Sequence, residues 1–285
     1  MTTEFNQTQY NEGRFALYDS ETMPYSKDNH FSHFALTDAL ITGAGETDQP
    51  MIHFWQTPPL VILGMMDTKL GKFDEAFPLF EDYKHDVIIR NSGGLGVISD
   101  SGVLNVSLIY PSNKKRLSID EAYEWMLHFI RDTFYPHFTK KEILAFEVAN
   151  SYCFGDYDLS IDGRKIAGVA QRRIKDGVAV MLYISVNGDQ LKRAEMMKEF
   201  YDRGLDGSEP EGRYPEIVPS VMTTLEEAYE STFTVSEVKE MMLKKFDWFK
   251  GKYSNELAKD YDEGLEKMHN RNARVFGDAF IEKMN

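Results

Sequence analysis

The segment Tyr157–Val186 constrains the fold more strongly than any other part of the sequence. Apolar and polar residues alternate over Tyr157–Ile161, which is the period of a β-strand with one buried face. Asp162-Gly163 follows at once and is typical of a two-residue hairpin turn. Asp176-Gly177 is a second such signal, and an apolar run follows it. The segment therefore predicts three consecutive antiparallel strands.

Other apolar runs predict further strands, and helical patterns lie between and after them. Ile52–Gly64 predicts two strand pieces interrupted by a proline pair, and Val87–Arg90 and Val103–Tyr110 predict one strand each. A capping box at Ser118 and Glu121 starts a helix whose apolar stripe is Ala122, Trp125, Met126, Phe129 and Ile130. A second capping box, at Thr234 and Glu237, precedes the stripe Val238, Met241, Met242, Phe246 and Phe249.

These strands cluster instead of alternating regularly with helices. The sequence therefore predicts an α+β fold with a mixed, largely antiparallel sheet flanked by helices. We expect a catalytic domain over residues 1–220 and a C-terminal helical extension, residues 221–285, packed on the core.

Composition narrows the classes of function. The 285 residues include 32 Lys plus Arg against 46 Asp plus Glu, and the net charge of −14 disfavours nucleic acid and anionic membranes as partners. Local basic spots at Lys114–Arg116 and Arg172-Arg173 could meet an acidic protein. No apolar run is long enough to span a membrane, and no signal-peptide pattern is found at the N-terminus. One cysteine excludes an internal disulfide and fits a reducing compartment, so we expect a cytoplasmic protein.

The single cysteine, Cys153, stands in a polar loop. Most lone cysteines are small buried apolar residues, but loops lie at the surface, where a thiol can react. A nearby ammonium would favour the reactive thiolate, and Lys165 is the candidate. The Asp162-Gly163 turn pairs Ser160 with Lys165, yet an extended chain from Ser160 to Cys153 spans roughly 23 Å. Lys165 is either a solvated strand lysine or, if the loop folds back over the sheet, a partner of the thiol.

A glycine-rich loop, Arg90–Gly102, leaves a predicted strand. Its consecutive N–H groups could bind an anion or a carbonyl oxygen, although an ordinary tight loop is an equal alternative. It matches neither the dinucleotide fingerprint nor the P-loop. The seven histidines form no zinc motif, so no metal site is predicted. His53, beside Trp55, is a candidate for lining a pocket.

Taken together, these stretches resemble the lipoate/octanoate transferase and ligase superfamily, whose catalytic domain shares its fold with biotin ligases. Lipoate ligases carry a basic residue, then S-G-G-G, then H-D and then N-x-x, an order matched here by Arg90, Ser92, Gly93, Gly94, Asp100 and Asn105. Leu95 replaces the third glycine and Ser99 replaces the histidine. Their K-I/V-S/A-G motif is matched by Lys165, Ile166, Ala167 and Gly168. The stretch containing His53 resembles their first strand pair, and the likeness covers roughly Phe31–Val186.

The pattern around the cysteine, S-Y-C-F-G-D-Y-D-L-S-I-D-G-R-K, resembles the amidotransferase branch, the octanoyl-transferring enzymes that use glycine cleavage H protein as donor. In that branch the cysteine forms an acyl-thioester and the lysine favours the thiolate. The resemblance implies that Cys153 is the nucleophile and Lys165 its partner. It implies substrate-binding residues at Arg90, Ser92, Gly93, Gly94, Asn105 and Gly168, to which the pocket candidate His53 is added.

The same resemblance implies an acyltransferase that needs no cofactor, because exchanging one lysine amide for another is close to energy-neutral without ATP. The implied partners are glycine cleavage H protein as donor and E2 lipoyl domains of 2-oxoacid dehydrogenases as acceptors. Three alternatives stay open, namely an octanoyl-acyl-carrier-protein transferase, an ATP-dependent lipoate ligase and a non-catalytic binder of lipoyl domains. The sequence leaves open whether the acyl group is octanoyl or lipoyl, the direction of transfer and the oligomeric state.

Overall fold

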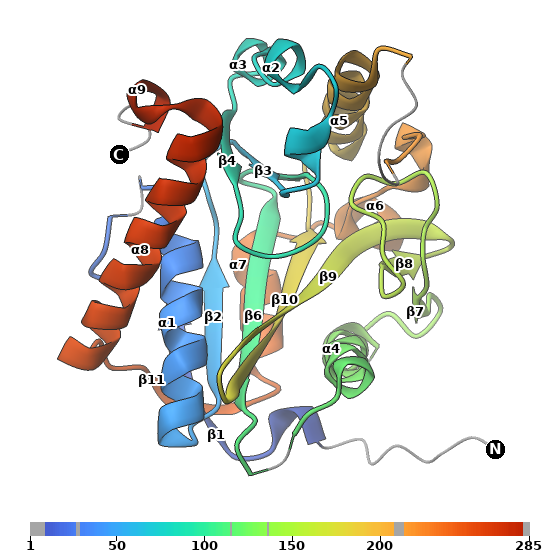
Figure 1. The fold of residues 1–285 in the computed structure, drawn as a ribbon. Helices are drawn as coiled ribbons and strands as arrows, with labels where there is room; N and C mark the ends of the chain where they lie inside the picture. The colour runs from blue at the N-terminus through green and yellow to red at the C-terminus, as the bar shows by residue number, and fades with distance from the viewer. Residues whose placement is uncertain (1–8, 27–28, 115, 136, 208–213, 282–285) are drawn as a thin grey trace.

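The computed structural model describes residues 9–26, 29–114, 116–135, 137–207 and 214–281. Its larger sheet has eight strands (Figure 1), which in spatial order are β11 (Asp247–Lys250), β1 (Arg14–Asp19), β2 (Met51–Trp55), β6 (Val103–Pro111), β10 (Gly177–Ser185), β9 (Arg164–Ile174), β8 (Leu159–Ile161) and β7 (Ile143–Ala145). β1 runs parallel to β2 and to β11, and the other neighbouring strands are antiparallel. The expected α+β class with a mixed, largely antiparallel sheet is confirmed.

A smaller sheet has three strands, in the order β4 (Asp86–Ile89), β3 (Leu60–Leu63) and β5 (Val97–Ser99). β3 is parallel to β4 and antiparallel to β5. The proline pair thus breaks one apolar run into strands of two different sheets. Strand β5 was not predicted, and its three residues lie inside the segment expected to be a glycine-rich loop.

The described residues also form α-helices and short 3-10 helices. The α-helices are α1 (Ser32–Thr47), α2 (Phe73–Ala76), α3 (Leu79–Asp82), α4 (Ile119–Phe134), α5 (Gln190–Leu205), α6 (Leu225–Tyr229), α7 (Val235–Leu243), α8 (Asn255–Phe276) and α9 (Asp278–Ile281). The 3-10 helices are η1 (Gln9–Asn11), η2 (Asp67–Lys69) and η3 (Pro219–Val221). Within this described part, no helix combines the length and apolarity needed to cross a membrane.

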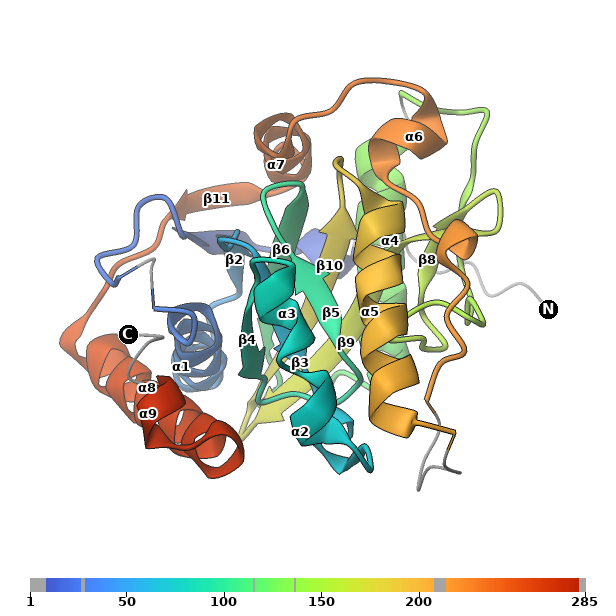
Figure 2. The ribbon, with the colours of Figure 1, turned by 90° about the horizontal axis from the view of Figure 1, so that it is seen from above.

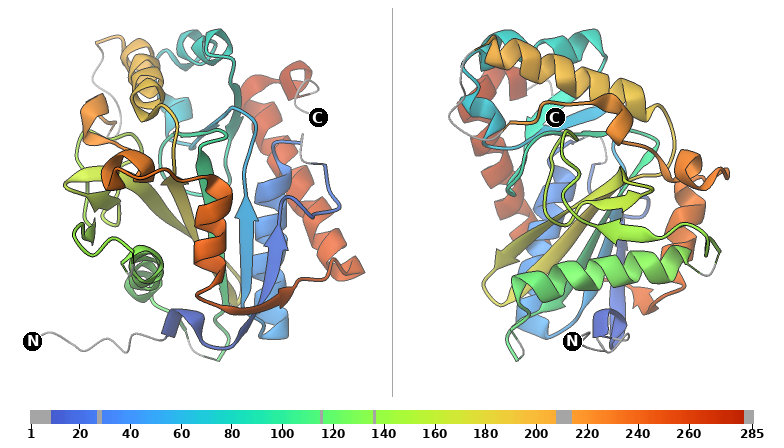
Figure 3. Two further views of the ribbon diagram at one scale, coloured as in Figure 1. Left: turned by 180° about the vertical axis from the view of Figure 1, so that it is seen from behind. Right: turned by 90° about the vertical axis from the view of Figure 1, so that its right-hand side faces the viewer.

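Helices cover both faces of the larger sheet (Figure 2). α1 and α8 lie against each other on one face, and α4 and α7 lie on the opposite face, as the view from behind shows for α7 (Figure 3). Successive side chains of β2 point to opposite faces of the larger sheet. Ile52 and Phe54 belong to the core under α4, whereas Trp55 contacts Phe34 of α1. The smaller sheet, with α2, α3 and α5, packs at one end of the α1 face through a second core.

The predicted meander is present as β8, β9 and β10. The Asp162-Gly163 turn has positive φ at both residues and pairs Ser160 with Lys165, as expected. The second turn is shifted by one residue, because Lys175 takes a positive φ and Gly177 already pairs with Ile174. Both predicted capping boxes are present, at the starts of α4 and α7.

The C-terminal part of the chain contributes more than helices. α7 ends at Leu243, so Phe249, which the sequence analysis included in its apolar stripe, lies in β11 instead. β11 extends the larger sheet beside β1, and α8 packs on α1. Residues 221–285, expected to be a helical extension, therefore also supply an edge strand.

Two residues of the basic spots are paired with acidic side chains. Lys114 forms an ion pair with Asp48, and Arg172 forms one with Asp38 of α1. Lys115 lies outside the described residues. These pairs leave less free positive charge on the surface than the sequence alone suggests.

Candidate active site

A cavity of about 340 Å³ opens where the α1 face of the larger sheet meets the smaller sheet. Its walls include the apolar side chains Phe34, Trp55, Ile62, Val97 and Met181. All the predicted site residues except His53 line it, namely Arg90, Ser92, Gly93, Gly94, Asn105, Cys153, Lys165 and Gly168. The fold thus brings the glycine-rich loop, the cysteine loop and β9 to one place.

The cysteine loop folds back over the sheet. Cys153 has φ of 47°, in the left-handed region that side chains rarely adopt, and its side chain is half-buried. Lys165 Nζ donates to the carbonyl oxygens of Cys153, at 2.7 Å, and Tyr152, at 3.0 Å, and to Ser151 Oγ at 3.3 Å. The lysine therefore holds the backbone of the loop that presents the thiol.

Lys165 is buried with a carboxylate partner. Its Nζ lies 2.9 Å from Asp158 Oδ1, and both side chains are only 2 % exposed. Burial raises the pKa of Asp158, and the Lys165 charge opposes that rise. The interpretation of Lys165 as a solvated strand lysine is wrong, because the cysteine loop covers the polar face that it shares with Asp158 and Ser160.

The cation that contacts the sulfur is Arg90. Its Nη2 lies 3.5 Å from Cys153 Sγ and donates to the Leu95 carbonyl at 2.9 Å. Arg90 is buried, and among the described residues its Nε has no hydrogen-bond partner. The sequence assigned Arg90 to substrate binding, and the geometry also places its charge against the thiol.

Gly94 makes this contact sterically feasible. Its φ is 96°, and a Cβ built on it would lie 2.3 Å from Arg90 Nη2 and 3.3 Å from Cys153 Sγ. Gly64 is equally restricted, because its Cβ would lie 1.9 Å from the Gly94 carbonyl oxygen. Gly93 is open, with nothing within 4 Å of a built Cβ. Gly168 faces Lys165 at ordinary contact distance.

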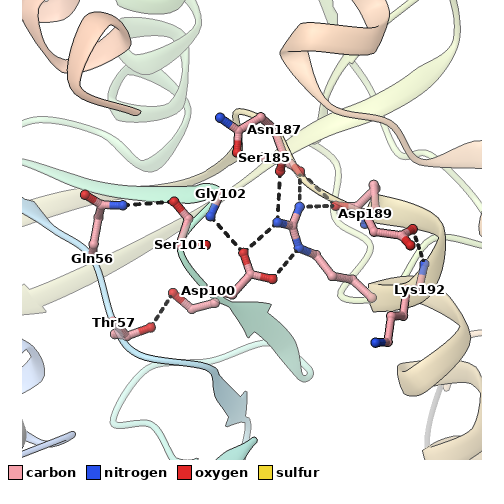
Figure 4. Close-up of polar contacts among 12 residues, drawn as sticks. Gln56, Thr57, Asp100, Ser101, Gly102, Ser185, Asn187, Asp189 and Lys192 are labelled. Atoms are coloured by element: carbon pink, nitrogen blue, oxygen red, sulfur yellow. Dashed lines mark hydrogen bonds and ion pairs between the residues drawn. The ribbon is translucent and has the colours of Figure 1, made fainter. Parts of the chain in front are cut away.

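The C-terminal end of the glycine-rich loop is anchored to the rest of the fold. Asn105 Nδ2 donates to Ser99 Oγ at 3.2 Å, and Thr57 Oγ1 donates to the same oxygen at 2.8 Å. Asp100, which matched the ligase H-D motif, pairs through both oxygens with Arg193 of α5, at 2.6 and 2.8 Å, and accepts from the Gly102 N–H (Figure 4). Asp100 therefore ties the β5–β6 turn to α5.

His53 does not reach the cavity. Its side chain is fully buried between β2 and α1, where Nδ1 lies 3.0 Å from Thr37 Oγ1, and its ring stacks near Trp55. Burial lowers the pKa of His53 well below its usual range. Trp55, two residues later in the same strand, lines the cavity instead.

A buried carboxylate that no sequence pattern predicted lies behind the glycine-rich loop. Asp67 accepts a hydrogen bond from Gly64 N–H at 2.7 Å and another from the Tyr201 hydroxyl at 2.8 Å. Burial raises its pKa to about 6, although these bonds and the Arg90 charge oppose the rise. No motif surrounds Asp67, and Tyr201 lies far away in the sequence, so no local pattern could have paired them.

Comparison with known proteins decides the family. The family described as the lipoyl protein ligase A/B catalytic domain matches residues 29–247. This chain belongs to that family. The resemblance stated from the sequence is thereby confirmed.

Curated relatives of this chain carry transferase names. Octanoyl-[GcvH]:protein N-octanoyltransferase of Oceanobacillus iheyensis is 40% identical over 81% of this chain and 82% of that protein. The protein of that name from Macrococcus caseolyticus is 38% identical over 93% and 96%, respectively. Lipoyl-[GcvH]:protein N-lipoyltransferase of Listeria monocytogenes is 36% identical over 71% and 73%. The expectation of an acyltransferase is confirmed.

Solved structures agree on the fold of this family. A lipoate-protein ligase A bound with ATP superimposes with a TM-score of 0.68 at 15% identity, covering 93% of this chain and 99% of the other. A bi-partite lipoate protein ligase from Thermoplasma acidophilum gives 0.63 at 16% identity, covering 94% and 97%. At this identity the likeness establishes the architecture alone.

Replacing Gly94 with alanine should distort the cavity and lower acyl transfer. The added Cβ meets the Arg90 guanidinium, and the backbone must hold a φ that alanine rarely adopts. We expect acyl transfer to fall about 100-fold, because a displacement of about 1 Å at a reacting centre has that effect. Gly207→Ala is the control, since Gly207 also has a positive φ but no described residue lies within 4 Å of a Cβ built on it. Equal losses in the two variants would contradict the steric argument.

The buried Asp67 should make the free energy of unfolding depend on pH. The native carboxyl keeps its proton up to about pH 6, whereas an unfolded aspartate releases it near ~3.9. The native state therefore binds the extra proton in between, and stability from this group rises as pH falls. Relative to Asp67→Asn, the free energy of unfolding should gain about 1 kcal/mol between pH ~7 and ~5. Urea unfolding at several pH values measures this gain, and a constant difference would contradict it.

Proposed function

We propose that this chain is a cysteine-dependent amidotransferase that moves an octanoyl or lipoyl group from a lysine of glycine cleavage H protein to a lysine of an E2 lipoyl domain. The observation that carries the proposal is the contact between Cys153 Sγ and the buried Arg90 guanidinium inside an apolar-walled cavity. A guanidinium at this position favours the thiolate, which is the nucleophilic form. The names of the curated relatives support the donor and the acyl group.

The first half of the reaction breaks an amide and forms a thioester. The Cys153 sulfur attacks the acyl carbonyl carbon of the donor lysine amide, and a tetrahedral intermediate forms. The C–N bond then breaks, and the departing lysine nitrogen takes the proton that the thiol gave up. An acyl-enzyme and a free donor lysine result.

The second half reverses these steps with another protein. The acceptor lysine amine attacks the thioester carbonyl, the C–S bond breaks, and the proton lost by the amine returns to sulfur. One amide is exchanged for another, so we propose that the chain needs neither ATP nor another cofactor. The thioester has to survive between the two halves, and an apolar cavity keeps water away from it.

Separate groups of this chain would support the reacting atoms. Arg90 and Gly94 lie against the sulfur. The Arg90 guanidinium and the N–H groups of Ser92–Gly94, which line the same cavity, are suited to stabilise the oxyanion. Lys165 holds the cysteine loop through its carbonyl oxygens. Burial of about six methylenes of the acyl chain at ~0.8 kcal/mol each would contribute roughly 5 kcal/mol of binding. Asn105 and Gly168 border the same space.

We propose E2 lipoyl domains as acceptors because a lipoyl group is used there as a lysine amide, the bond type that this chemistry makes. The T. acidophilum structure is described together with its E2 lipoyl domain, which supports such partners for this architecture. A thiol that must stay reduced between turnovers suits the cytoplasm.

Mixing the purified protein with octanoylated H protein, without ATP, tests the proposal. After an acid quench, the intact mass should show one added octanoyl group, which hydroxylamine should remove because thioesters are labile to it. Addition of an apo lipoyl domain before the quench should move the group to that domain. An adduct from octanoyl-acyl carrier protein alone would instead assign the acyl-carrier-protein branch. Modification of the lipoyl domain only with octanoate and ATP would indicate a ligase.

A further inference from the structure

The carboxylate of Asp67 lies directly behind the glycine loop. Asp67 is fully buried at the start of η2, just after β3, and both of its oxygens accept hydrogen bonds. One bond comes from Gly64 N–H at 2.7 Å and the other from the Tyr201 hydroxyl at 2.8 Å. A buried carboxylate is costly unless it is bonded in this way, so its presence calls for a reason.

The two partners of Asp67 hold both sides of the glycine loop. Gly64 abuts Gly94, because a Cβ on Gly64 would lie only 1.9 Å from the Gly94 carbonyl oxygen. The Tyr201 hydroxyl, in turn, accepts a hydrogen bond from Gly96 N–H at 3.3 Å. A displacement of the carboxylate would therefore move the loop on both sides of Gly94, which lies against Cys153 Sγ.

The charge of Asp67 acts on the same cation that faces the thiol. Burial raises the pKa of Asp67, and the positive charge of Arg90 opposes that rise, as expected of opposite charges in one buried region. No carboxylate among the described residues lies within ion-pair distance of Arg90. The other titratable groups near Asp67 are the phenols of Tyr201 and Tyr214; burial raises the pKa of each, and the Asp67 charge adds to the rise. The Arg90 charge thus acts both on the Asp67 carboxylate and on the Cys153 thiol.

We propose that Asp67 is a positioning residue for the nucleophile. Asp67 fixes the glycine-rich loop through Gly64 and Tyr201, and its negative charge offsets part of the Arg90 charge that faces Cys153. The proposal rests on the proposed role of Cys153. It predicts opposite effects on two properties, since loss of the carboxylate leaves more of the Arg90 charge to the thiolate but releases the loop that surrounds the acyl carbonyl. A residue needed only for packing would move both properties in one direction.

The test compares thiol reactivity with acyl transfer in three variants. Iodoacetamide labels the only cysteine of the chain, and intact mass gives the rate. Asp67→Asn should label about threefold faster than the wild type near pH 7.5, while octanoyl transfer from H protein falls at least tenfold. The labelling advantage should vanish below pH ~6, where Asp67 is protonated in the wild type. Tyr201→Phe keeps the charge, so it should label at the wild-type rate but transfer more slowly.

Tyr214→Phe is the matched control, because the Tyr214 hydroxyl bonds to the Met66 carbonyl and not to Asp67. It should match the wild type in both assays. Slower labelling and slower transfer together in Asp67→Asn would overturn the proposal, as would wild-type values for both. If Asp67→Asn fails to fold, a wild-type transfer rate in Tyr201→Phe overturns it. Labelling needs no acyl donor, so failure of the proposed function would show separately, as absence of an acyl adduct on the wild type.

Discussion

Cys153→Ala is expected to lower octanoyl transfer at least about 10³-fold and to abolish the acyl-enzyme. Removal of a covalent nucleophile has effects of this size or larger, because no second group supplies the bond. The side chain is half-buried in a loop, so the free energy of unfolding should change by less than about 1 kcal/mol. Rates of transfer between octanoylated H protein and an apo lipoyl domain, read by intact mass, measure the loss.

Cys153→Ser serves as the control for shape. It keeps a small polar side chain at the same left-handed position, so it should fold and bind donor normally while transferring poorly. If either variant retained a tenth of the wild-type rate, the thioester would not be on the main route. ATP-dependent ligation or simple binding would then have to explain the cavity.

Lys165→Met is expected to lower both stability and activity. The change leaves Asp158 charged and buried without its cation, and breaking a buried pair in this way costs about 3–5 kcal/mol. The carbonyl oxygens of Tyr152 and Cys153 also lose their donor, so the cysteine loop should leave its place over the sheet. Urea unfolding measures the first effect, and acyl-enzyme formation at low urea measures the second.

Two further variants separate charge from packing. Adding Asp158→Asn to Lys165→Met removes the unpaired carboxylate of Asp158, and at least about 1 kcal/mol of stability should return. Lys198→Met breaks the exposed ion pair with Asp202 within α5 and should change stability by no more than about 0.5 kcal/mol. A loss for Lys165→Met as small as that for Lys198→Met would show that the buried pair carries little of the stability.

The sheet register was predictable where local turn chemistry decided it. The Asp162-Gly163 turn fixes the β8–β9 pairing, and the structure follows it residue for residue up to Ser160. The Asp176-Gly177 prediction failed by one residue for a tertiary reason. A Cβ on Gly177 would lie 2.0 Å from the Ile41 carbonyl oxygen, so glycine is needed there to let α1 approach β10. The positive φ falls on Lys175 instead.

The site was predictable where residues share a strand face or a motif. The predicted register placed Lys165 opposite Ser160, as observed. It did not predict the burial of Lys165 against Asp158, because the covering loop closes through contacts that no local pattern encodes. Arg90 was found by resemblance, while its contact with the sulfur depends on how two loops meet. Asp67 joins Gly64, which follows β3, to Tyr201 of α5, and such a junction exists only after folding.

The edge strand β11 has a consequence for the order in which the molecule is made. Arg14 of β1 pairs with Asp247, 233 positions later. At a synthesis rate of about 5–20 residues per second, the free side of β1 stays open for roughly 10 seconds or more on the ribosome. An unpaired strand edge is a template for association with other chains. The nascent chain therefore exposes this edge of β1 until residues 247–250 have emerged.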